Sequence, residues 1–438
     1  MSTPLLVAIL VLVAGGIALA LRIDTRLVLA LAGAALFVAA GRIPDFAAQF
    51  ALEMANPRTV VPICLAWGFA RILKLTECDC HLVHLLLRPM RAARWLLVPG
   101  GVAACFIVNT AVVSQTGTAS IVGPLLVPLL LAAGFGPVTA GAVLLLGSSM
   151  GGELFNPGAV ELATLAPLVN LSPRQVVARV TPANLLACGV ALLVFWIASV
   201  RWPPRALPDD ATAAPCPPAP APIRVNLIKA LVPLLPLAIL FLLPAARHHL
   251  PPLLRPPELP GHVEILAAML IGSTAAALTA PSCANKLTAA FFEGAGYAYA
   301  HVVSFIVVAT TFAAGIAATG LIERAAAPLV RAPAALTLAS AILPGSLAVI
   351  TGTGIGTGVP LIKILVPLAS QSGAEPLRIG TLVAIFAQFG RTSSPVAPVV
   401  ILCATFAGVK PTRLLWRVGP ALLAGATVLV IGALFKWI

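Results

Sequence analysis

The chain has 438 residues, of which 60% are hydrophobic and only 9% are charged, and its mean hydropathy is +1.04. This composition excludes a soluble globular domain and predicts a polytopic membrane protein. The formal net charge of +13 could suggest nucleic-acid binding, but the basic residues lie in short segments between apolar runs, where the positive-inside rule places them. We therefore expect contact with membrane lipid and no nucleic-acid partner.

The first part of the chain, residues 1–201, predicts one repeat of the fold. It contains three spans, a hairpin over 95–133, an interrupted span over 137–169 and a last span over 182–200. Apolar runs of roughly 17–25 residues are long enough for a helix to cross a bilayer. The first run begins directly after Met1-Ser2-Thr3, without basic residues, which favours an uncleaved span over a signal peptide.

A polar SQTGT segment at 114–118 divides the predicted hairpin into two arms. The second arm, Ala119–Ala133, has only 15 residues and contains Pro124 and Pro128. A segment of this length does not cross a bilayer comfortably. We therefore predict a re-entrant helical hairpin whose tip lies at mid-depth in the membrane.

The span over 137–169 is interrupted by SSMGGELFNPG at 148–158. Gly-Gly and Asn-Pro-Gly are helix breakers, so this span is predicted to consist of two half-helices around an unwound turn. Residues 202–225 are rich in proline and alanine and predict an extended or disordered linker.

Residues 226–438 predict a second repeat, with three spans, a hairpin over 333–370, an interrupted span over 376–408 and a last span over 417–437. TGTGIGTGVP at Thr351–Pro360 corresponds to the polar tip of the first hairpin. The arm that follows it, Val359–Ser370, has 12 residues. QFGRTSSPVAP at 388–398 interrupts the second span, as SSMGGELFNPG interrupts the first.

The two halves share an alignment of glycines and prolines. A shift of 239 places Gly117, Pro128, Pro137, Gly141 and Gly151 on Gly356, Pro367, Pro376, Gly380 and Gly390, and a shift of 238 places Pro157, Pro173 and Pro182 on Pro395, Pro411 and Pro420. About one such match is expected by chance, so the alignment indicates duplication. Five predicted crossings separate the hairpins, so the repeats are inverted. The expected fold is all-α, with about ten transmembrane helices and two re-entrant hairpins.

Inverted repeats with facing hairpins and interrupted helices are typical of secondary transporters, which bind cargo near the membrane midplane. Glycine allows close backbone approach, while hydroxyl groups and helix N-termini bind anions. The alternative is that these small residues only allow close helix packing, but four breaks arranged by a repeat favour a binding site. The candidate substrate-binding residues are Ser114, Thr116, Gly117, Thr118, Ser148, Ser149, Asn156, Thr353, Gly356, Thr357, Gln388, Arg391, Thr392, Ser393 and Ser394.

Charged residues within the spans indicate the cargo. Arg391 lies in the middle of a span, where inserting an arginine into the membrane costs roughly 2.5–3.5 kcal/mol. A residue this costly is expected to have a function, and its positive charge predicts an organic anion as substrate. Glu153 aligns with Arg391 at the shift of 238, so a structural ion pair is the alternative. Glu153 and Glu161 are candidates for ion coupling, although Glu161 could instead face water. Lys363 either binds cargo or extends its amine to the interface.

We expect no cofactor, with Na⁺ or H⁺ as a possible coupling ion and Gly117, Asn156 and Gly356 as a possible Na⁺ site. Cys78, Cys80, His81 and His84 read as part of a loop and offer a less favoured metal site.

The sequence also allows two other classes of membrane protein. GSSMG at Gly147–Gly151 fits G-x-S-x-G, so Ser149 and His301 would serve an intramembrane serine protease. An anion channel is the other alternative, although pores seldom need paired hairpins. We expect a carrier and no enzyme.

The segment AQFGRTSSPVAPVVILCATFAGVKPTRLLWRVGPALL, Ala387–Leu423, resembles the C-terminal signature of the DcuC family of C4-dicarboxylate transporters, within the ion-transporter superfamily. SQTGTASIVGPLLVP and SSMGGELFNPG are similar to the hairpin and interrupted span in the first half of that family. The resemblance implies ion-coupled transport or exchange of succinate, fumarate or malate across the bacterial inner membrane. It also implies an elevator-type movement of the hairpin domain, commonly in a homodimer.

Overall fold

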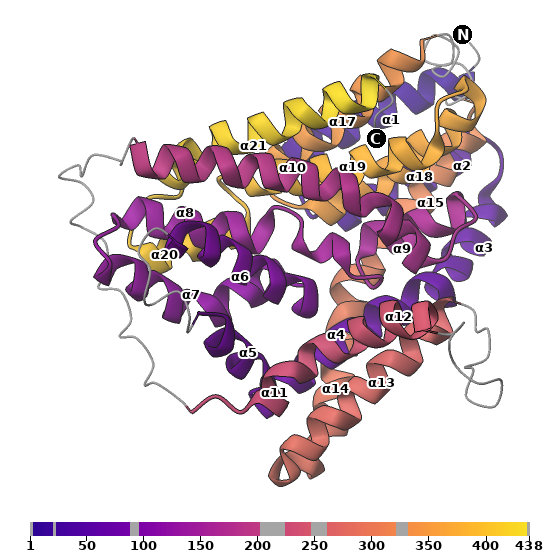
Figure 1. Cartoon of the computed structure of the whole chain (residues 1–438). Helices are drawn as coiled ribbons and strands as arrows, with labels where there is room; N and C mark the ends of the chain where they lie inside the picture. The colour runs from indigo at the N-terminus through magenta and orange to yellow at the C-terminus, as the bar shows by residue number, and fades with distance from the viewer. Residues whose placement is uncertain are drawn as a thin grey trace.

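The computed structural model describes residues 3–20, 23–87, 96–201, 224–246, 261–320 and 332–435, and these residues form helices joined by short turns (Figure 1). Most of the predicted linker, residues 202–223, lies outside the described residues, as does Trp95 at the start of the predicted first hairpin. Within the described part, the regular elements are all helical, as the composition predicts.

The helices before the linker are α1 (Thr3–Ala20), α2 (Thr25–Ala39), α3 (Ile43–Met54), α4 (Pro57–Thr76), α5 (Cys78–Leu87), α6 (Leu97–Val112), α7 (Gln115–Ala132), α8 (Pro137–Ser149), the 3₁₀ turn η3 (Gly152–Phe155), α9 (Val160–Leu168) and α10 (Pro173–Arg201). Those after it are α11 (Leu227–Leu231), η5 (Val232–Leu234), α12 (Leu235–Ala246), α13 (Gly261–Thr279), η8 (Pro281–Cys283), α14 (Ala284–Ala298), the π-helical turn η9 (Tyr299–Val303), α15 (Ser304–Ala318), α17 (Pro333–Thr351), α18 (Gly354–Ser372), α19 (Pro376–Thr392), α20 (Pro398–Ala407) and α21 (Pro411–Leu434).

Two pairs of helices meet at sharp tips of the same design. Val113 between α6 and α7 has φ 52°, and Gly352 between α17 and α18 has φ 73°, so both residues are left-handed. The next residue caps the following helix in each case, because Ser114 Oγ accepts from Gly117 N and Thr353 Oγ1 accepts from Gly356 N, both at 3.1 Å.

The second arms of both hairpins are longer than the sequence predicted. α7 has 18 residues and α18 has 19, where 15 and 12 were expected. The prediction was wrong because the glycines and threonines after each tip continue the helix once Ser114 or Thr353 caps it. Both arms are long enough to cross a membrane, so their length does not indicate a re-entrant hairpin.

Seven described helical stretches are long and apolar enough to cross a membrane. They are Gln115–Ala132, Pro137–Leu168, Pro173–Arg201, Pro281–Ala318, Pro333–Thr351, Gly354–Ser372 and Pro411–Leu434. Three of them are hairpin arms, and shorter apolar helices occur elsewhere in the chain. This count is lower than the ten crossings expected.

The buried side chains divide the helices into two groups. The largest core cluster joins α5–α10 to α17–α21, which we call the hairpin group. Smaller clusters join α4, α12 and α13, and α2, α4 and α15; we call α1–α4 and α11–α15 the outer group. Val160 of α9 and Val359 of α18 belong to the cluster around α15, so the two groups meet there.

Within the hairpin group, the two interrupted helices pack closely on each other. α8 packs on α20 and α9 packs on α19. A Cβ atom at Gly141 of α8 would lie 2.6 Å from the Ala407 Cβ, and one at Gly380 of α19 would lie 2.3 Å from Leu165 Cδ1. Glycine is therefore required for the approach at Gly141, whereas at Gly380 a larger residue would have to displace the Leu165 side chain.

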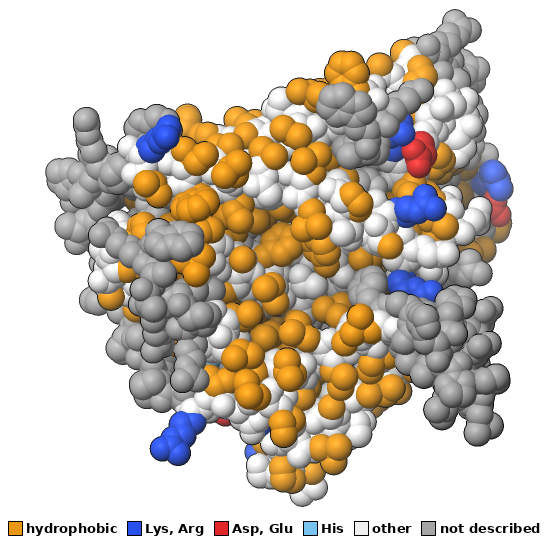
Figure 2. Space-filling view, in the orientation of Figure 1, with side chains coloured by type: hydrophobic (Ala, Val, Ile, Leu, Met, Phe, Trp, Pro, Cys, Tyr) orange, Lys and Arg blue, Asp and Glu red, His pale blue; other side chains and the backbone are white. Residues whose placement is uncertain are grey.

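The surface of the molecule matches a lipid environment. Figure 2 shows hydrophobic side chains across most of one face, with Lys and Arg near its left and right margins. Large apolar side chains are strongly exposed, among them Trp416 at 84% and Leu278 at 79%. A continuous apolar surface of this kind is unusual for a soluble protein and is expected where lipid surrounds the chain.

Candidate functional site

The end of α19 carries Arg391 into the first interrupted segment. Arg391 Nη1 lies 3.1 Å from Glu153 Oε1, Nη2 donates to the Ser149 carbonyl oxygen at 2.9 Å, and Nε donates to Ser149 Oγ at 3.3 Å. The side chains of Arg391 and Glu153 are only 6% and 4% exposed. The ion pair considered from the repeat alignment is therefore present, and it is buried.

The same contact region includes Thr392 and the first hairpin tip. Thr392 Oγ1 lies 2.9 Å from both Ser149 O and Ser149 Oγ, and 2.7 Å from the Gln388 carbonyl oxygen. Gln115 Nε2, from the first turn of α7, donates to Glu153 Oε2. Both interrupted segments and the first tip thus converge on one buried polar network.

The second hairpin also approaches this network. A Cβ atom at Gly354 would lie 3.2 Å from Arg391 Nη1, and one at Gly358 would lie 3.3 Å from Glu161 Cγ. Glu161, in the first turn of α9, accepts a hydrogen bond from Gln388 Nε2 at 2.9 Å. The glycines of α18 therefore bring its backbone close to the two charged side chains.

Three polar residues of the network were absent from the predicted set. Gln115 contacts Glu153, Asn109 Oδ1 accepts from Glu153 N at 2.9 Å, and the Thr110 carbonyl oxygen accepts from Asn156 Nδ2 at 2.9 Å. Asn109 and Thr110 are adjacent polar residues in an otherwise apolar arm. Two adjacent polar residues in an apolar arm were the feature of the sequence that could have identified Asn109 and Thr110 as site residues.

Several predicted residues make local contacts instead. The hydroxyls of Ser114 and Thr353 cap their own helices, and Thr357 Oγ1 donates to the Thr353 carbonyl oxygen. Thr118 and Ser148 have buried hydroxyls without a partner among the described residues. The structure gives the side chains of Thr116 and Ser393 no contact with the network, and Ser394 Oγ accepts from Val396 N at 3.4 Å.

The three residues considered for a Na⁺ site have different neighbours. Asn156 contacts Thr110 and Gly158, Gly117 lies beside Ser114, and Gly356 lies beside Thr353 and Phe305. The described contacts therefore do not bring these three residues together. Lys363 lies 3.8 Å from Glu53 Oε1 of α3, so it pairs across the boundary between the two groups.

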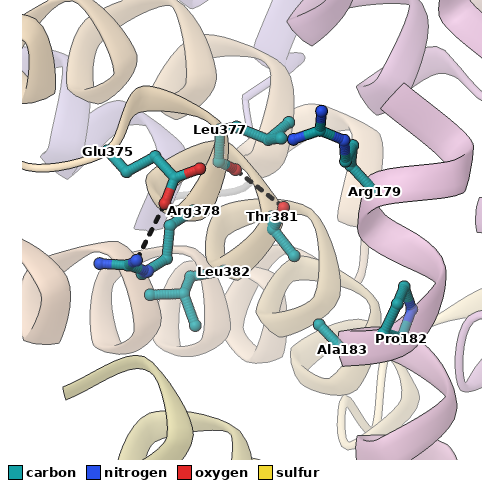
Figure 3. Close-up of a pocket in the computed structure, with 8 residues that line it drawn as sticks. All are labelled: Arg179, Pro182, Ala183, Glu375, Leu377, Arg378, Thr381 and Leu382. Atoms are coloured by element: carbon teal, nitrogen blue, oxygen red, sulfur yellow. Dashed lines mark hydrogen bonds and ion pairs between the residues drawn. The ribbon is translucent and has the colours of Figure 1, made fainter. Parts of the chain in front are cut away.

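A cavity of about 300 Å³ adjoins the first hairpin tip. Ser114, Gly117 and Ser120 line it from α7, and Arg71 and Lys74 line it from α4. A second cavity, of about 250 Å³, lies between α10 and the start of α19 (Figure 3). Its lining includes Arg179 and the ion-paired Arg378 and Glu375, but none of the predicted site residues.

The segment Cys78–His84 is helical rather than a loop, because it lies in α5. Its histidines contact backbone groups: His84 Nδ1 lies 2.9 Å from the Cys80 carbonyl oxygen, and His81 Nδ1 accepts from Asn226 N. Among the residues that the structure describes, no three His, Cys, Asp or Glu side chains converge as metal ligands.

The two residues of the protease alternative have separate contacts. Ser149 Oγ lies against Arg391 and Thr392 and is fully buried. His301 stacks on Tyr297 with ring centroids 4.1 Å apart. Nucleophilic catalysis requires the serine to lie within hydrogen-bonding distance of its base. The described contacts of Ser149 and His301 do not join them.

Comparison with known proteins identifies the family. A sequence model of the C4-dicarboxylate anaerobic carrier family, DcuC, matches residues 58–437. The chain belongs to this family. Membership and the apolar helices make it a multi-pass inner-membrane transporter of the C4-dicarboxylate type.

The individual proteins that this chain resembles are also transporters. The chain is 27% identical over 282 residues to a putative uncharacterized transporter of Haemophilus influenzae, covering 64% of this chain and 99% of the relative. It is 29% identical to the anaerobic C4-dicarboxylate transporter DcuC of Escherichia coli K12 over 143 residues, which are 32% of this chain and 31% of that protein. The fold is similar to that of the Alcanivorax borkumensis YdaH transporter, with a TM-score of 0.51 at 16% identity, over 100% of this chain and 99% of that one.

Proposed function

We propose that the protein is a secondary active transporter that moves a C4-dicarboxylate such as succinate, fumarate or malate across the bacterial inner membrane by alternating access. Its DcuC family supports a dicarboxylate cargo, and the buried Arg391 supports recognition of a carboxylate. Arginine is suited to this role because its planar guanidinium presents paired N–H donors to a carboxylate.

The contacts of Glu153 carry the proposal. Its carboxylate lies between the Arg391 guanidinium and the Gln115 amide, where both interrupted segments and the first tip meet. The Arg391 and Gln115 donors therefore already bind one carboxylate of the chain, that of Glu153, at a site shielded from water. A guanidinium has five N–H donors, and the contacts with Glu153 and Ser149 leave Arg391 donors for a substrate carboxylate. The second substrate carboxylate would bind backbone N–H groups at the tips of α7 and α18.

We infer two inverted repeats from the recurrence of helix contacts. α6 packs on α8 as α17 packs on α19, and α7 packs on α20 as α18 packs on α9. The capped tips at Ser114 and Thr353 occupy matching places. The separate cores of the hairpin group and the outer group support an elevator-type mechanism, in which the hairpin group moves as a unit. We expect the outer group to provide the contacts of a homodimer.

Proteoliposome transport tests this function. Purified protein is expected to take up labelled succinate with saturation kinetics, and unlabelled fumarate and malate should compete. Arg391→Lys keeps the charge but cannot reproduce the three guanidinium contacts, so it should fold and lose uptake. Arg174→Lys is the control, because Arg174 also faces a glutamate, Glu264 at 3.8 Å, but lies outside the network.

Three outcomes would contradict the proposal. Unsaturable flux of many anions indicates a channel, and competition by other organic anions but not by C4-dicarboxylates indicates a different cargo. Full uptake by Arg391→Lys would remove Arg391 from the binding site.

A further inference from the structure

Glu161 is a buried carboxyl group without a basic partner among the described residues. It lies in the first turn of α9 and is 1% exposed. Its side chain has one described hydrogen bond, from Gln388 Nε2 at 2.9 Å. Glu153, by contrast, faces the Arg391 guanidinium. The network therefore holds two carboxyl groups and one fixed positive charge.

The charge around Glu161 becomes more negative when substrate binds. The charged groups that act on it are Glu153 of the interrupted segment and Arg391 of α19, while its neighbour on α18 is the uncharged Gly358. A dicarboxylate adds two negative charges to this site. Because a buried charge without a partner is strongly unfavourable, binding of the dianion should be accompanied by uptake of a positive charge near Glu161.

The geometry favours a proton over a metal ion as that charge. Hard cations such as Na⁺ take several oxygen ligands, but Glu161 has only one described side-chain hydrogen-bond partner, the Gln388 amide. The other side-chain atom of this amide, Gln388 Oε1, is buried and has no partner among the described residues. A protonated Glu161 would offer an O–H donor, and a half-turn of the amide would let Oε1 accept it.

We propose that Glu161 binds one proton when the dicarboxylate binds and releases it on the opposite side of the membrane, so that transport is proton-coupled. The proton comes from water on the side where substrate binds and adds to a carboxylate oxygen of Glu161. Gln388 turns its amide to match, as donor to the charged form and acceptor from the neutral form. This inference rests on the proposed function and assigns its coupling ion.

Proton uptake on binding is the first test. Calorimetric titration of the detergent-purified full chain with succinate, in buffers of different ionisation enthalpy, should show about one proton taken up per succinate bound at a pH where Glu161 is charged in the absence of substrate. Glu161→Gln should bind succinate with no proton uptake, and Glu161→Asp should retain it. Wild-type binding without proton uptake would overturn the inference, even if Glu161→Gln does not fold.

Transport gives the second test. With the membrane potential clamped by valinomycin and equal K⁺, an inside-alkaline gradient of one pH unit should drive up to about tenfold accumulation for one proton. Glu161→Gln should lose this accumulation while it still exchanges labelled for unlabelled succinate. Glu53→Gln is the matched control, because Glu53 is also buried but pairs with Lys363, and it should respond to the gradient as the wild type does.

The outcomes separate this inference from the proposed function. Accumulation by Glu161→Gln that equals the wild type, or wild-type accumulation that follows a sodium gradient and not the pH gradient, would overturn proton coupling at Glu161. Failure of the wild type to bind or exchange any C4-dicarboxylate would instead contradict the proposed function.

Discussion

Replacing Gly390 by alanine tests whether close packing of α19 on α17 holds Arg391 in place. A Cβ atom at Gly390 would lie 2.2 Å from the Gly345 carbonyl oxygen and 2.9 Å from the Ala348 Cβ. Ordinary contact begins near 3.4 Å. The oxygen belongs to the backbone of α17, so no side-chain rotation relieves the clash. The two helices must therefore separate by about 1 Å.

The expected cost has two parts. Overpacking costs about 1–3 kcal/mol, and the higher helix propensity of alanine offsets about 0.5–1 kcal/mol of it. Arg391 follows Gly390 directly, so its 3.1 Å contact with Glu153 should lengthen. A displacement of about 1 Å at a functional group can reduce activity on the order of 100-fold. We therefore expect a lower melting temperature and a larger relative loss of succinate uptake.

Gly345→Ala provides the control on the facing helix. Its Cβ atom would meet Phe386 Cδ1 at 3.6 Å, which is ordinary contact. Thermal unfolding in detergent and succinate uptake in proteoliposomes are measured for both variants. If Gly390→Ala unfolds and transports like the wild type, or if both variants lose activity equally, the packing argument is refuted.

Arg391→Gln leaves two buried carboxyl groups without a counter-charge and should lower the unfolding free energy by about 3–5 kcal/mol. Glu153→Gln should cost less, because the charge of Glu161 still acts on Arg391 without contacting it. The double variant should recover part of the loss in thermal unfolding, and additive losses would argue against the pair. Ser114→Ala and Thr353→Ala each remove a helix cap worth roughly 0.5–2 kcal/mol, so amide hydrogen exchange at each tip should accelerate, and unchanged exchange would count against the cap. Lys74→Gln removes an exposed positive charge beside the cavity at the first tip. Its uptake should be slower than wild type at low salt and equal at high salt; equal rates at low salt would rule out steering by Lys74.

Local chemistry explains the parts of the structure that the sequence could predict. The helix interruptions after Ser149 and Thr392 lie in segments that carry glycine and proline breakers, whose effect is confined to a few residues. The contact between Glu153 and Arg391 could be anticipated because the repeat alignment relates positions that are far apart in the chain.

Other features depend on contacts that no local pattern encodes. The sequence singled out Gln388 and Glu161 separately, but their contact joins residues 227 positions apart, and the repeat alignment does not pair them. The hairpin arms were predicted too short because glycine-rich sequence has a low helix propensity. Packing against α8 and α19 overrides that preference. The helix over Cys78–Leu87 was missed because its polar residues obscured an apolar face that is buried in the structure.

The close packing of α8 on α20 at Gly141 has a mechanical consequence. α8 cannot easily slide along α20 there, because the Ala407 Cβ atom and the Cys403 carbonyl oxygen fill the space beside Gly141. The two groups adjoin along a different contact, where Val160 and Val359 pack with α15 and Lys363 pairs with Glu53. In the elevator-type movement that we propose, both halves of the network would move together, and a substrate bound between Arg391 and the tips would cross the bilayer without losing its ligands.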